Sequence, residues 1–272
     1  MTQSDGYNQL ERFDKVDLTG EQAMFFAFLD RTDTLPDIVR RRQRSYELLN
    51  LRPGTSVVDV GCGLGTVVRE LAARIGPSGV VMGVDMSETM VAEARRRAQR
   101  AGAAVRFHAG GAEQLPIEDG GVQAYYAERL FQHLSNPQVA LGEALRVLAP
   151  GGRVVLVDQD WDSFMLDSDD LELSRRIHRV FADSLVNGTV GRQFRRLLLD
   201  AGFVAVEVFA ETVTCAEAGQ YAFLVDVLAK NARAAGMDGS QVDAWAAEQH
   251  RLVAEDRFFM AMTHFVATGT RA

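Results

Sequence analysis

The sequence predicts an α/β fold: a seven-stranded, mostly parallel sheet with helices on both of its faces and a helical cap. Two observations lead to this prediction. Short runs rich in β-branched and aromatic residues alternate with stretches of helical periodicity, and the first run passes directly into a turn with three glycines at alternate positions. Such alternation is typical of parallel sheets whose strands are joined by right-handed crossover helices.

The expected strands are short and regularly spaced. They lie at 57–60, 80–84, 105–109, 122–126, 153–158, about 204–213 and about 258–268. Two of the helices between them have clear start signals. Ser87 is expected to cap a helix that runs to about Ala101 and stops at Gly102. A second helix is expected to open at Asn136-Pro137, because proline is favoured in the first turn.

Three helical segments do not fit the simple alternation, and all of them have apolar faces. Two of them follow the fifth and sixth strands, so they leave the sheet at the edge where open α/β sheets bind ligands. We therefore expect one domain, 1–272, in which these segments cap the ligand. Its parts are an N-terminal helical cap (1–50), a ligand-binding core (51–160), two cap insertions (161–190 and 215–256) and the rest of the sheet (191–214 and 257–272). The alternative is that the extra helices only fill the core or form a dimer interface.

Composition narrows the possible partners. The chain of 272 residues has a net charge of −8, which argues against non-specific attraction to nucleic acid. The arginine runs at 40–42 and 95–97 are expected to lie on solvated helix faces. Two cysteines suggest neither a disulfide framework nor a metal cluster, and they fit a cytoplasmic protein. No apolar run approaches the ~20 residues of a membrane span, and no signal peptide is expected.

The most specific signal is the run from Val57 to Gly65, in which a strand enters a G-x-G-x-G turn. Glycines allow a sharp turn and a close approach of the backbone to a ligand. Asp85 ends the second strand, where a carboxylate accepts hydrogen bonds from the hydroxyls of a ribose. Together they indicate a nucleoside-containing ligand. The alternative for Asp85 is a helix-start role beside Ser87.

The charge of the first strand distinguishes between nucleoside ligands. Asp59 stands close to the glycine turn, and an unpaired carboxylate there would repel a pyrophosphate. A ligand with an ammonium and a sulfonium group would be attracted instead. S-adenosylmethionine has both charges and no phosphate, so it is the expected cofactor.

Four motifs in order now point to a known family. They are Asp59-x-Gly61-x-Gly63-x-Gly65, then Asp85, then Glu113-Gln114-Leu115-Pro116-Ile117, and then Leu148-Ala149-Pro150-Gly151-Gly152. The chain resembles the class I S-adenosylmethionine-dependent methyltransferases, which have a Rossmann-like sheet, and especially their ubiquinone/menaquinone-type small-molecule branch. The resemblance covers about residues 45–160.

The resemblance implies a set of cofactor-binding residues. They are Asp59, Gly61, Gly63, Gly65, Asp85, Met86, Ala112, Glu113 and Glu128. Asp85 should hold the ribose, Met86 and the 112–113 pair should flank the adenine, and Glu128 should approach the methionine end. One position departs from the family, because Gly111 stands where relatives have an aspartate that binds the adenine amino group. A backbone carbonyl or a water molecule would have to replace that carboxylate.

The catalytic and substrate-binding residues are less clearly marked. His133, just after the fourth strand, is the candidate general base, and the alternative is that it fixes the loop. Trp161 and Tyr7 are candidate substrate contacts. Cys62 is expected to pack as a small residue, and His264 is expected to be a structural histidine in the last strand. No cluster of metal ligands is visible, so no metal is expected.

We therefore expect transfer of a methyl group to O, N or C of an apolar or aromatic small molecule. A homodimer and a role in secondary metabolism are further expectations. The alternative is a protein of the same fold that binds the cofactor but catalyses a non-methylating reaction such as cyclisation. Formation of S-adenosylhomocysteine in the presence of substrate would distinguish the two. Neither nucleic acid nor membrane is an expected partner.

Overall fold

The structure, a computed structural model, describes residues 13, 16–20, 22–215 and 223–272. Its centre is a seven-stranded sheet with the strand order β3-β2-β1-β4-β5-β7-β6. The strands are β1 (Ser56–Val60), β2 (Val80–Asp85), β3 (Arg106–Ala109), β4 (Val122–Glu128), β5 (Leu148–Leu166), β6 (Val204–Cys215) and β7 (Met260–Thr270). Strand β7 pairs antiparallel with both of its neighbours, β5 and β6, and the other described pairs are parallel. The predicted seven-stranded, mostly parallel sheet is confirmed.

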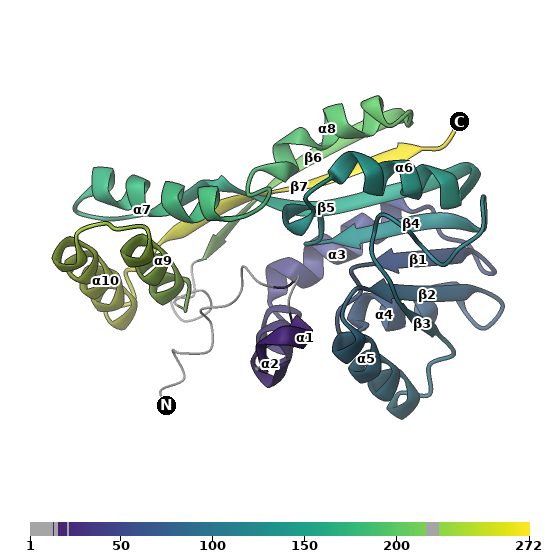
Figure 1. The fold of residues 1–272 in the computed structure, drawn as a ribbon, viewed down its shortest axis with the longest axis horizontal. Helices are drawn as coiled ribbons and strands as arrows, with labels where there is room; N and C mark the ends of the chain where they lie inside the picture. Colours follow the sequence, from purple (N-terminus) through teal and green to yellow (C-terminus); the bar gives the residue numbers. More distant parts are fainter. Residues whose placement is uncertain (1–12, 14–15, 21, 216–222) are drawn as a thin grey trace.

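Helices cover both faces of the sheet (Figure 1). On one face lie α6 (Pro137–Val147) and α8 (Val190–Asp200). On the other lie α3 (Pro36–Leu48), α4 (Thr66–Ile75) and α5 (Glu88–Arg100). This two-sided arrangement follows from the βαβ connections, because each right-handed crossover returns the chain across one face.

The predicted start signals act as expected. The Ser87 hydroxyl accepts a hydrogen bond from the Met90 N–H (3.1 Å) and so caps α5, and Gly102 follows the helix with a φ of +64°. Helix α6 begins at Pro137, directly after Asn136. Its apolar stripe includes Leu141 and Ala144, which are buried, so amphipathic patterning as well as the proline fixes its position.

Strand β5 is much longer than the sequence predicted. It was expected to end at residue 158, but it continues to Leu166, so the cap insertion expected at 161–190 begins with strand rather than helix. The extension pairs with β7 through Met165 and Leu166, after an irregularity that follows Asp160. Asp160 and Asp162 interrupt the apolar sequence at this point, so a hydrophobicity pattern does not predict that the strand continues. The pairing with β7 is a long-range contact that overrides the local signal.

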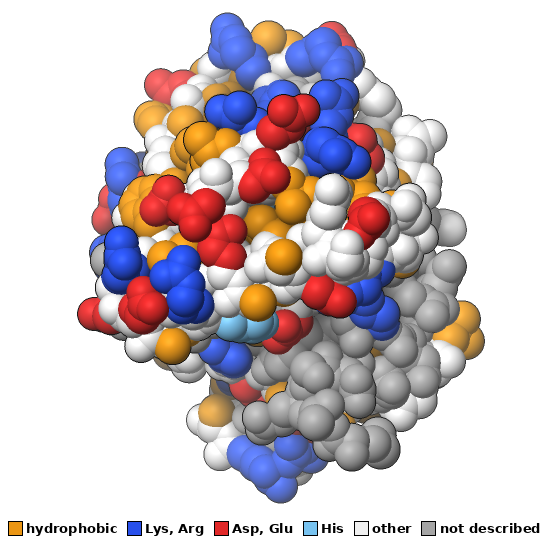
Figure 2. Space-filling view, turned by 90° about the vertical axis from the view of Figure 1, so that its left-hand side faces the viewer, with side chains coloured by type: hydrophobic (Ala, Val, Ile, Leu, Met, Phe, Trp, Pro, Cys, Tyr) orange, Lys and Arg blue, Asp and Glu red, His pale blue; other side chains and the backbone are white. Residues whose placement is uncertain are grey.

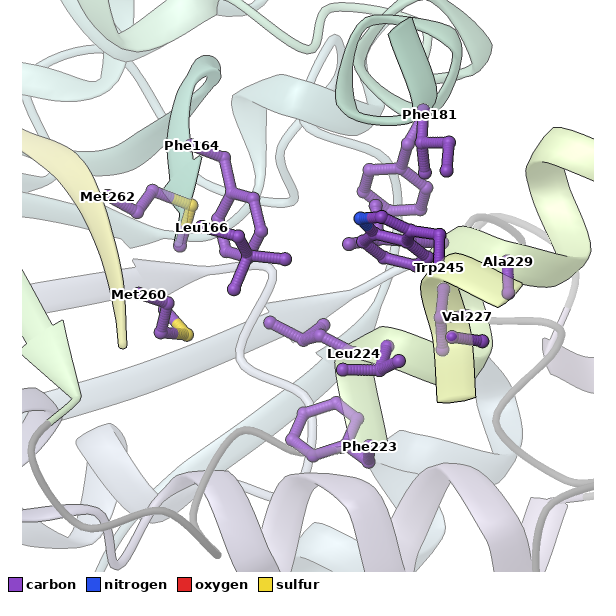
Figure 3. Packing of buried hydrophobic residues seen from close by; sticks show 14 of the residues in the cluster. Phe164, Leu166, Phe181, Phe223, Leu224, Val227, Ala229, Trp245, Met260 and Met262 are labelled. Carbon is purple, nitrogen blue, oxygen red and sulfur yellow. The ribbon is translucent and has the colours of Figure 1, made fainter. Parts of the chain in front are cut away.

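Three helices pack around the extended ends of β5 and β7, at the left of Figure 1. They are α7 (Leu171–Ser184), α9 (Phe223–Ala234) and α10 (Gly239–Ala254). Figure 3 shows their apolar side chains, including Phe181, Leu224 and Trp245, gathered with Phe164 and Leu166 of the strand. These residues form a hydrophobic cluster of their own. It is separate from the two clusters that lie on the two faces of the central sheet.

The N-terminal residues are divided between two places. Two helices, α1 (Val16–Thr19) and α2 (Gln22–Thr32), form a small cluster around Phe25 and Met90. Helix α3 contacts both parts of the molecule. Its Ile38 joins the cluster of the helical end, and its Tyr46 packs beneath the sheet, where it meets Tyr126 of β4 edge-on (5.5 Å between ring centroids). The role of residues 1–50 as one cap stays a prediction.

The arginine run at 40–42 is a second correction. Arg40 is exposed, but Arg41 and Arg42 are buried, at 1% and 2% exposure. Both point inward because the buried face of α3 contains Ile38, Ser45 and Tyr46, which are spaced as on one side of a helix. Arg42 reaches two carboxylates, whereas the guanidinium of Arg41 makes no hydrogen bond with any described residue.

The surface over α7, α9 and α10 has mixed charge. Acidic and basic side chains alternate across this end of the molecule, with apolar side chains between them (Figure 2). Across the described residues, no helix combines the length and the apolar character that crossing a membrane requires.

Candidate active site

A cavity of about 410 Å³ opens beyond the carboxyl ends of β1, β2 and β4. One half, the cofactor half, is lined by the glycine turn and by the residues that follow β1, β2 and β3. The other, the acceptor half, is lined by α2, α7, α9 and the residues after β4 and within β5. Its apolar wall consists of Phe13, Phe28, Leu134, Trp161, Phe181, Leu185, Val186 and Leu224.

The glycine turn is held by backbone hydrogen bonds to the end of β2. The N–H groups of Gly61 and Cys62 donate to the Val84 carbonyl, at 2.8 and 3.0 Å. Gly61 and Gly63 have φ values of +75° and +48°, which explains why glycine is needed at both. Both line the cavity. A side chain at Gly61 would also press against Leu130, so the turn brings bare backbone to the ligand.

Two neighbours in the turn have structural roles. Gly65 does not line the cavity, in contrast to the expectation that it binds the cofactor. It starts α4 with a φ of +70°, and a Cβ there would lie 2.7 Å from the ring of Phe107. Burial raises the pKa of the Cys62 thiol well above its usual value, which fits packing rather than reactivity.

Asp85 links the turn to the next helix. Its Oδ2 accepts from the Gly63 N–H (2.8 Å) and its Oδ1 from the Ser87 N–H (3.0 Å). Each oxygen keeps a second lone pair, because a carboxylate oxygen accepts two hydrogen bonds. Burial raises the pKa of Asp85 despite these two bonds. The side chain is thus fixed in place and still able to accept from two further donors.

Two buried carboxylate oxygens in the cofactor half have no partner. Asp59 Oδ2 and Glu128 Oε1 make no hydrogen bond with any described residue, and both side chains line the cavity. Burial, followed by the charge of Glu128, raises the pKa of Asp59 well above its usual value. An unpaired buried carboxylate is costly unless a cation or a proton compensates it. This pair of oxygens is therefore suited to a positively charged group.

An ion network fixes Glu128 from below. Arg42 donates through Nε to Glu128 Oε2 (2.5 Å) and through a terminal nitrogen to Asp33 Oδ1 (2.7 Å). Arg129 donates to the same Asp33 oxygen (2.8 Å) and to the hydroxyl of Thr32. Burial disfavours ionisation of Asp33, but the two guanidinium groups outweigh it and lower its pKa.

The opposite end of the cofactor half contains the residues expected around adenine. Met86 is exposed to the cavity, and Ala112 and Glu113 line it as well. Gly111 also lines it, and a Cβ built on Gly111 would lie 3.2 Å from Glu113 Oε2. The carboxylate of Glu113 thus stands in the space that an aspartate side chain at position 111 would enter.

Helix α1 closes this end. The Asp17 carboxylate accepts from the Ser87 hydroxyl (2.6 Å) and from the N–H groups of Glu88 (2.9 Å) and Thr89 (3.2 Å). Burial opposes ionisation of Asp17, but these hydrogen bonds lower its pKa. Asp17 therefore serves as a second cap for α5, contributed by a distant part of the chain, and it holds α1 beside Met86.

The acceptor half contains His133 and Trp161. His133 ends a short 3₁₀ helix, η2 (Phe131–His133), and its ring lies 5.7 Å from that of Phe13. Trp161 packs edge-on against Phe181, with 4.8 Å between centroids. Tyr7 lies outside the described residues.

An amide network crosses the same half. Gln132 Oε1 accepts from the Trp161 indole N–H (2.8 Å) and from Gln159 Nε2 (2.9 Å). The backbone N–H of Gln132 donates to Asp158 Oδ2 (3.3 Å). Asp158 is buried, which raises its pKa to about 7. It does not line the cavity but holds η2 from behind.

His264 is buried in β7, and its ring nitrogen Nδ1 makes no hydrogen bond with the part of the chain that the structure describes. Burial, with the nearby charges of Arg41 and Arg129, lowers its pKa well below the usual value, so the ring is neutral. It does not line the cavity. The expectation of a strand histidine agrees with this position, but its hydrogen bonding is incomplete.

Sequence reasoning missed several lining residues, above all Asp33, Arg42 and Gln159. Arg42 had a usable signal, because it falls on the same helical stripe as Ile38 and Ser45. Gln159 had none, because a polar residue in a strand end is common. Among the described residues, no group of three or more His, Cys, Asp or Glu side chains is placed to hold a metal ion.

The charge of the whole cavity favours a cationic ligand. Five carboxylates line it, from Asp33, Asp59, Asp85, Glu113 and Glu128, against the two guanidinium groups of Arg42 and Arg129. A diphosphate would face this excess of negative charge. The ammonium and sulfonium groups of S-adenosylmethionine fit it, and Asp85 fits a ribose.

Comparisons with known proteins agree with this fit. Residues 57–152 match a family described as a methyltransferase domain. Demethylmenaquinone methyltransferase of Lactococcus lactis is 31% identical over 182 residues, which cover 61% of this chain and 72% of that protein. An uncharacterised 37.1 kDa protein in transposon TN4556 of Streptomyces fradiae is 43% identical over 183 residues, 67% of this chain. The chain spans about half of that relative's length, 53%.

The fold has counterparts of known structure. Phosphoethanolamine N-methyltransferase 2 of Haemonchus contortus, solved with S-adenosyl-L-methionine, superposes with a TM-score of 0.62 over 95% of this chain and 59% of that one, at 16% identity. The chain belongs to the class I S-adenosylmethionine-dependent methyltransferases. The predicted family and the Rossmann-like fold are confirmed.

Proposed function

We propose that this protein transfers a methyl group from S-adenosylmethionine to an oxygen, nitrogen or carbon atom of an apolar or aromatic small molecule. One observation carries the proposal. Two buried carboxylate oxygens, Asp59 Oδ2 and Glu128 Oε1, lack partners among the described residues and lie beside a glycine turn, in a cavity with excess negative charge. A cationic ligand without phosphate satisfies all of these features.

Residues of the cofactor half would bind the methyl donor along its length. Asp59 and Glu128 would accept hydrogen bonds from its ammonium group, and Asp85 would accept from the ribose hydroxyls with its remaining lone pairs. Met86 would cover the adenine, and the Glu113 carboxylate would accept from the adenine amino group in place of the aspartate missing at Gly111. When bound, the sulfonium group supplies an already activated methyl group.

Residues of the acceptor half would position the methyl acceptor and exclude water. The aromatic rings of Phe28, Trp161 and Phe181 would hold a flat or apolar molecule. Orientation alone supplies roughly 7–11 kcal/mol in favourable cases. A ring nitrogen of His133 would take the proton from a hydroxyl or amine acceptor, a contribution of ~10²–10⁴-fold in rate.

Several broader assignments belong to this proposal. A small-molecule substrate is supported by the apolar wall of the cavity. A cap role for α7, α9 and α10 is supported by the Phe181 and Leu224 side chains, which line the cavity. A cytoplasmic location, a role in secondary metabolism and a homodimeric state are proposed from the sequence alone.

The proposal is tested first by calorimetry with S-adenosylmethionine, S-adenosylhomocysteine and NADH. We expect both sulfur compounds to bind and NADH not to bind. Affinity for S-adenosylmethionine should rise with pH, because the raised pKa of Asp59 means that this carboxyl loses its proton only at higher pH, and the ionised form attracts the cation. Saturable NADH binding without S-adenosylmethionine binding would contradict the proposal.

A second experiment tests the reaction. The protein is incubated with methyl-labelled donor and fractionated metabolite extracts, and both labelled product and S-adenosylhomocysteine are measured. We expect them to form in equal amounts. Conversion of a substrate without S-adenosylhomocysteine would instead support the non-methylating alternative.

A further inference from the structure

The largely apolar wall of the acceptor half contains a few polar side chains, those of Gln132, His133, Ser135 and Gln159. Gln159 lines the cavity, is buried at 5% exposure, and its Oε1 makes no hydrogen bond with any described residue. Its neighbours on this wall, Trp161 and Phe181, contribute mainly ring surface. A buried carbonyl oxygen without a donor is disfavoured, so this atom is a place where a ligand gains by supplying an N–H or O–H group.

The hydrogen-bond network fixes which end of the Gln159 amide is free. The indole nitrogen of Trp161 only donates, so the Gln132 atom that it meets at 2.8 Å must be the carbonyl oxygen. Gln159 contacts the same Gln132 oxygen at 2.9 Å, so it must present its NH₂ group there. The carbonyl oxygen of Gln159 is therefore the end that makes no hydrogen bond with any described residue.

The network is also held rigidly. The Trp161 backbone N–H donates to the Gly188 carbonyl (2.8 Å), and its ring rests on Phe181. The Gln132 carbonyl accepts from the Asn187 N–H (3.0 Å), and the Gln132 N–H donates to Asp158. Because Gln132, which accepts from the Gln159 amide, and Trp161, which donates to the same oxygen, are both tied to the backbone, the amide of Gln159 is oriented before a ligand arrives.

We propose that the Gln159 Oε1 atom accepts a hydrogen bond from the methyl acceptor, and that the site selects apolar ring compounds that carry a hydroxyl or N–H donor. This inference rests on the proposed function, since it assigns the substrate class of the same cavity. Gln159 contacts the substrate and determines specificity, and it takes no proton. A ring of the same shape without a donor would leave the buried oxygen unpaired, and sites of this kind reject such analogues strongly.

The test compares two ring probes of nearly equal shape, 2-naphthol and naphthalene. Their affinities for the full chain saturated with S-adenosylhomocysteine are measured by calorimetry. We expect 2-naphthol to bind at least about tenfold more tightly than naphthalene. The measured quantity is the ratio of the two affinities, because a general loss of packing would weaken both probes equally.

Two variants locate the effect. Gln159→Leu removes the acceptor oxygen and should lower the ratio to below about twofold. Gln249→Leu is the matched control. Gln249 is also fully buried with an unpartnered Oε1, but it lies in α10 and outside the cavity lining. It should leave the ratio unchanged.

The possible results separate this inference from the proposed function. If the chain binds neither S-adenosylmethionine nor S-adenosylhomocysteine, the proposed function fails. If it binds them but takes the two probes equally, or takes neither, the inference about Gln159 fails alone. An unchanged ratio in Gln159→Leu would also overturn it, provided that the variant retains wild-type affinity for S-adenosylhomocysteine as a sign of correct folding.

Discussion

The two halves of the cavity are built by different means. The cofactor half is formed by strand ends and a glycine turn that are close together in the sequence and topology, and its contacts are carboxylates, ion pairs and backbone hydrogen bonds. The acceptor half is assembled from residues between Phe13 and Leu224, and its contacts are rings, aliphatic side chains and one amide network. Charge dominates one half and shape dominates the other.

This difference teaches how binding and selection are separated in one protein. A ligand with fixed positive charges would bind beside carboxylate groups that have no partner without it. Asp59 and Glu128 each have such an oxygen, which makes no hydrogen bond with any described residue. The methyl acceptor would instead contact largely apolar walls. The buried carbonyl oxygen of Gln159 would orient the methyl acceptor there by accepting a hydrogen bond from it. We expect substitutions in one half to leave binding in the other half largely intact, and the following predictions test that expectation.

The largest effect is expected at Arg42, which supports the charged half from below. Arg42→Met leaves Glu128 and Asp33 buried with less compensation, and breaking a buried ion pair from one side costs about 3–5 kcal/mol. Denaturant unfolding measures this loss. Arg44→Met is the control: Arg44 pairs with Glu211 but is 69% exposed, so its loss should stay below about 1 kcal/mol. Equal losses of unfolding free energy in the two variants would contradict a stabilising role for the ion pairs of Arg42 with Asp33 and Glu128.

A smaller effect is expected at Asp59, on cofactor affinity rather than on folding. Asp59→Asn keeps the shape of the side chain but removes the charge that faces a cation, a loss of roughly 1.5–3 kcal/mol or about 10–150-fold in affinity. Calorimetry with S-adenosylmethionine measures it. Gln159→Leu, in the acceptor half, should change the same affinity less than twofold. If both variants weaken the cofactor equally, the two halves are not separable.

The third prediction concerns Asp158, behind the acceptor half. Burial raises the pKa of Asp158 to about 7, so the folded chain keeps this proton at pH values where the unfolded chain has lost it. The stabilisation is present at low pH and is lost as the pH rises from about 4 to about 7, at about 1.4 kcal/mol per pH unit. In Asp158→Asn this contribution to the slope of unfolding free energy should be absent. Parallel curves for wild type and variant would contradict it.

The smallest effect is expected at Asp17, which joins α1 to the first turn of α5. Removing a cap carboxylate costs about 1 kcal/mol. Asp17→Ala should therefore speed hydrogen exchange of the Glu88 and Thr89 amides, which lose their acceptor. Amides near the end of α5 serve as the internal control. Unchanged exchange at the first turn would show that Ser87 alone is a sufficient cap.

The contrast between the halves also explains what could be predicted from the sequence. The glycine turn and Asp85 follow strands at fixed spacing, so pattern and topology together placed them at one edge of the sheet. Gly65 has the same spacing but lies outside the cavity lining, where the ring of Phe107 leaves no room for a Cβ. The sequence alone does not distinguish a glycine that faces a ligand from one that faces a side chain.

The acceptor half was harder to predict because its parts meet only through long-range pairing. The extension of β5 depends on β7, about a hundred residues later, and a local pattern contains no trace of that partner. The two buried arginines of α3 were predicted to be solvated because they are charged. Their position on the same helical face as Ile38 and Ser45 was not used. The orientation of the Gln159 amide depends on Gln132 and Trp161, which form one hydrogen-bond network with it. Only the folded chain shows this network.

Strand β5 runs from the central sheet into the helical end of the molecule, and the part before the irregularity after Asp160 fixes the spacing of residues in the two halves of the cavity. The Val157 carbonyl accepts from the Arg129 N–H at the boundary of the charged half, and Gln159 follows two residues later. Covalent geometry spaces such residues about 7 Å apart along a strand. A single-residue insertion between them would turn the Gln159 side chain to the opposite face of the sheet. Length changes should therefore be tolerated in the connecting loops but not at this point of the chain.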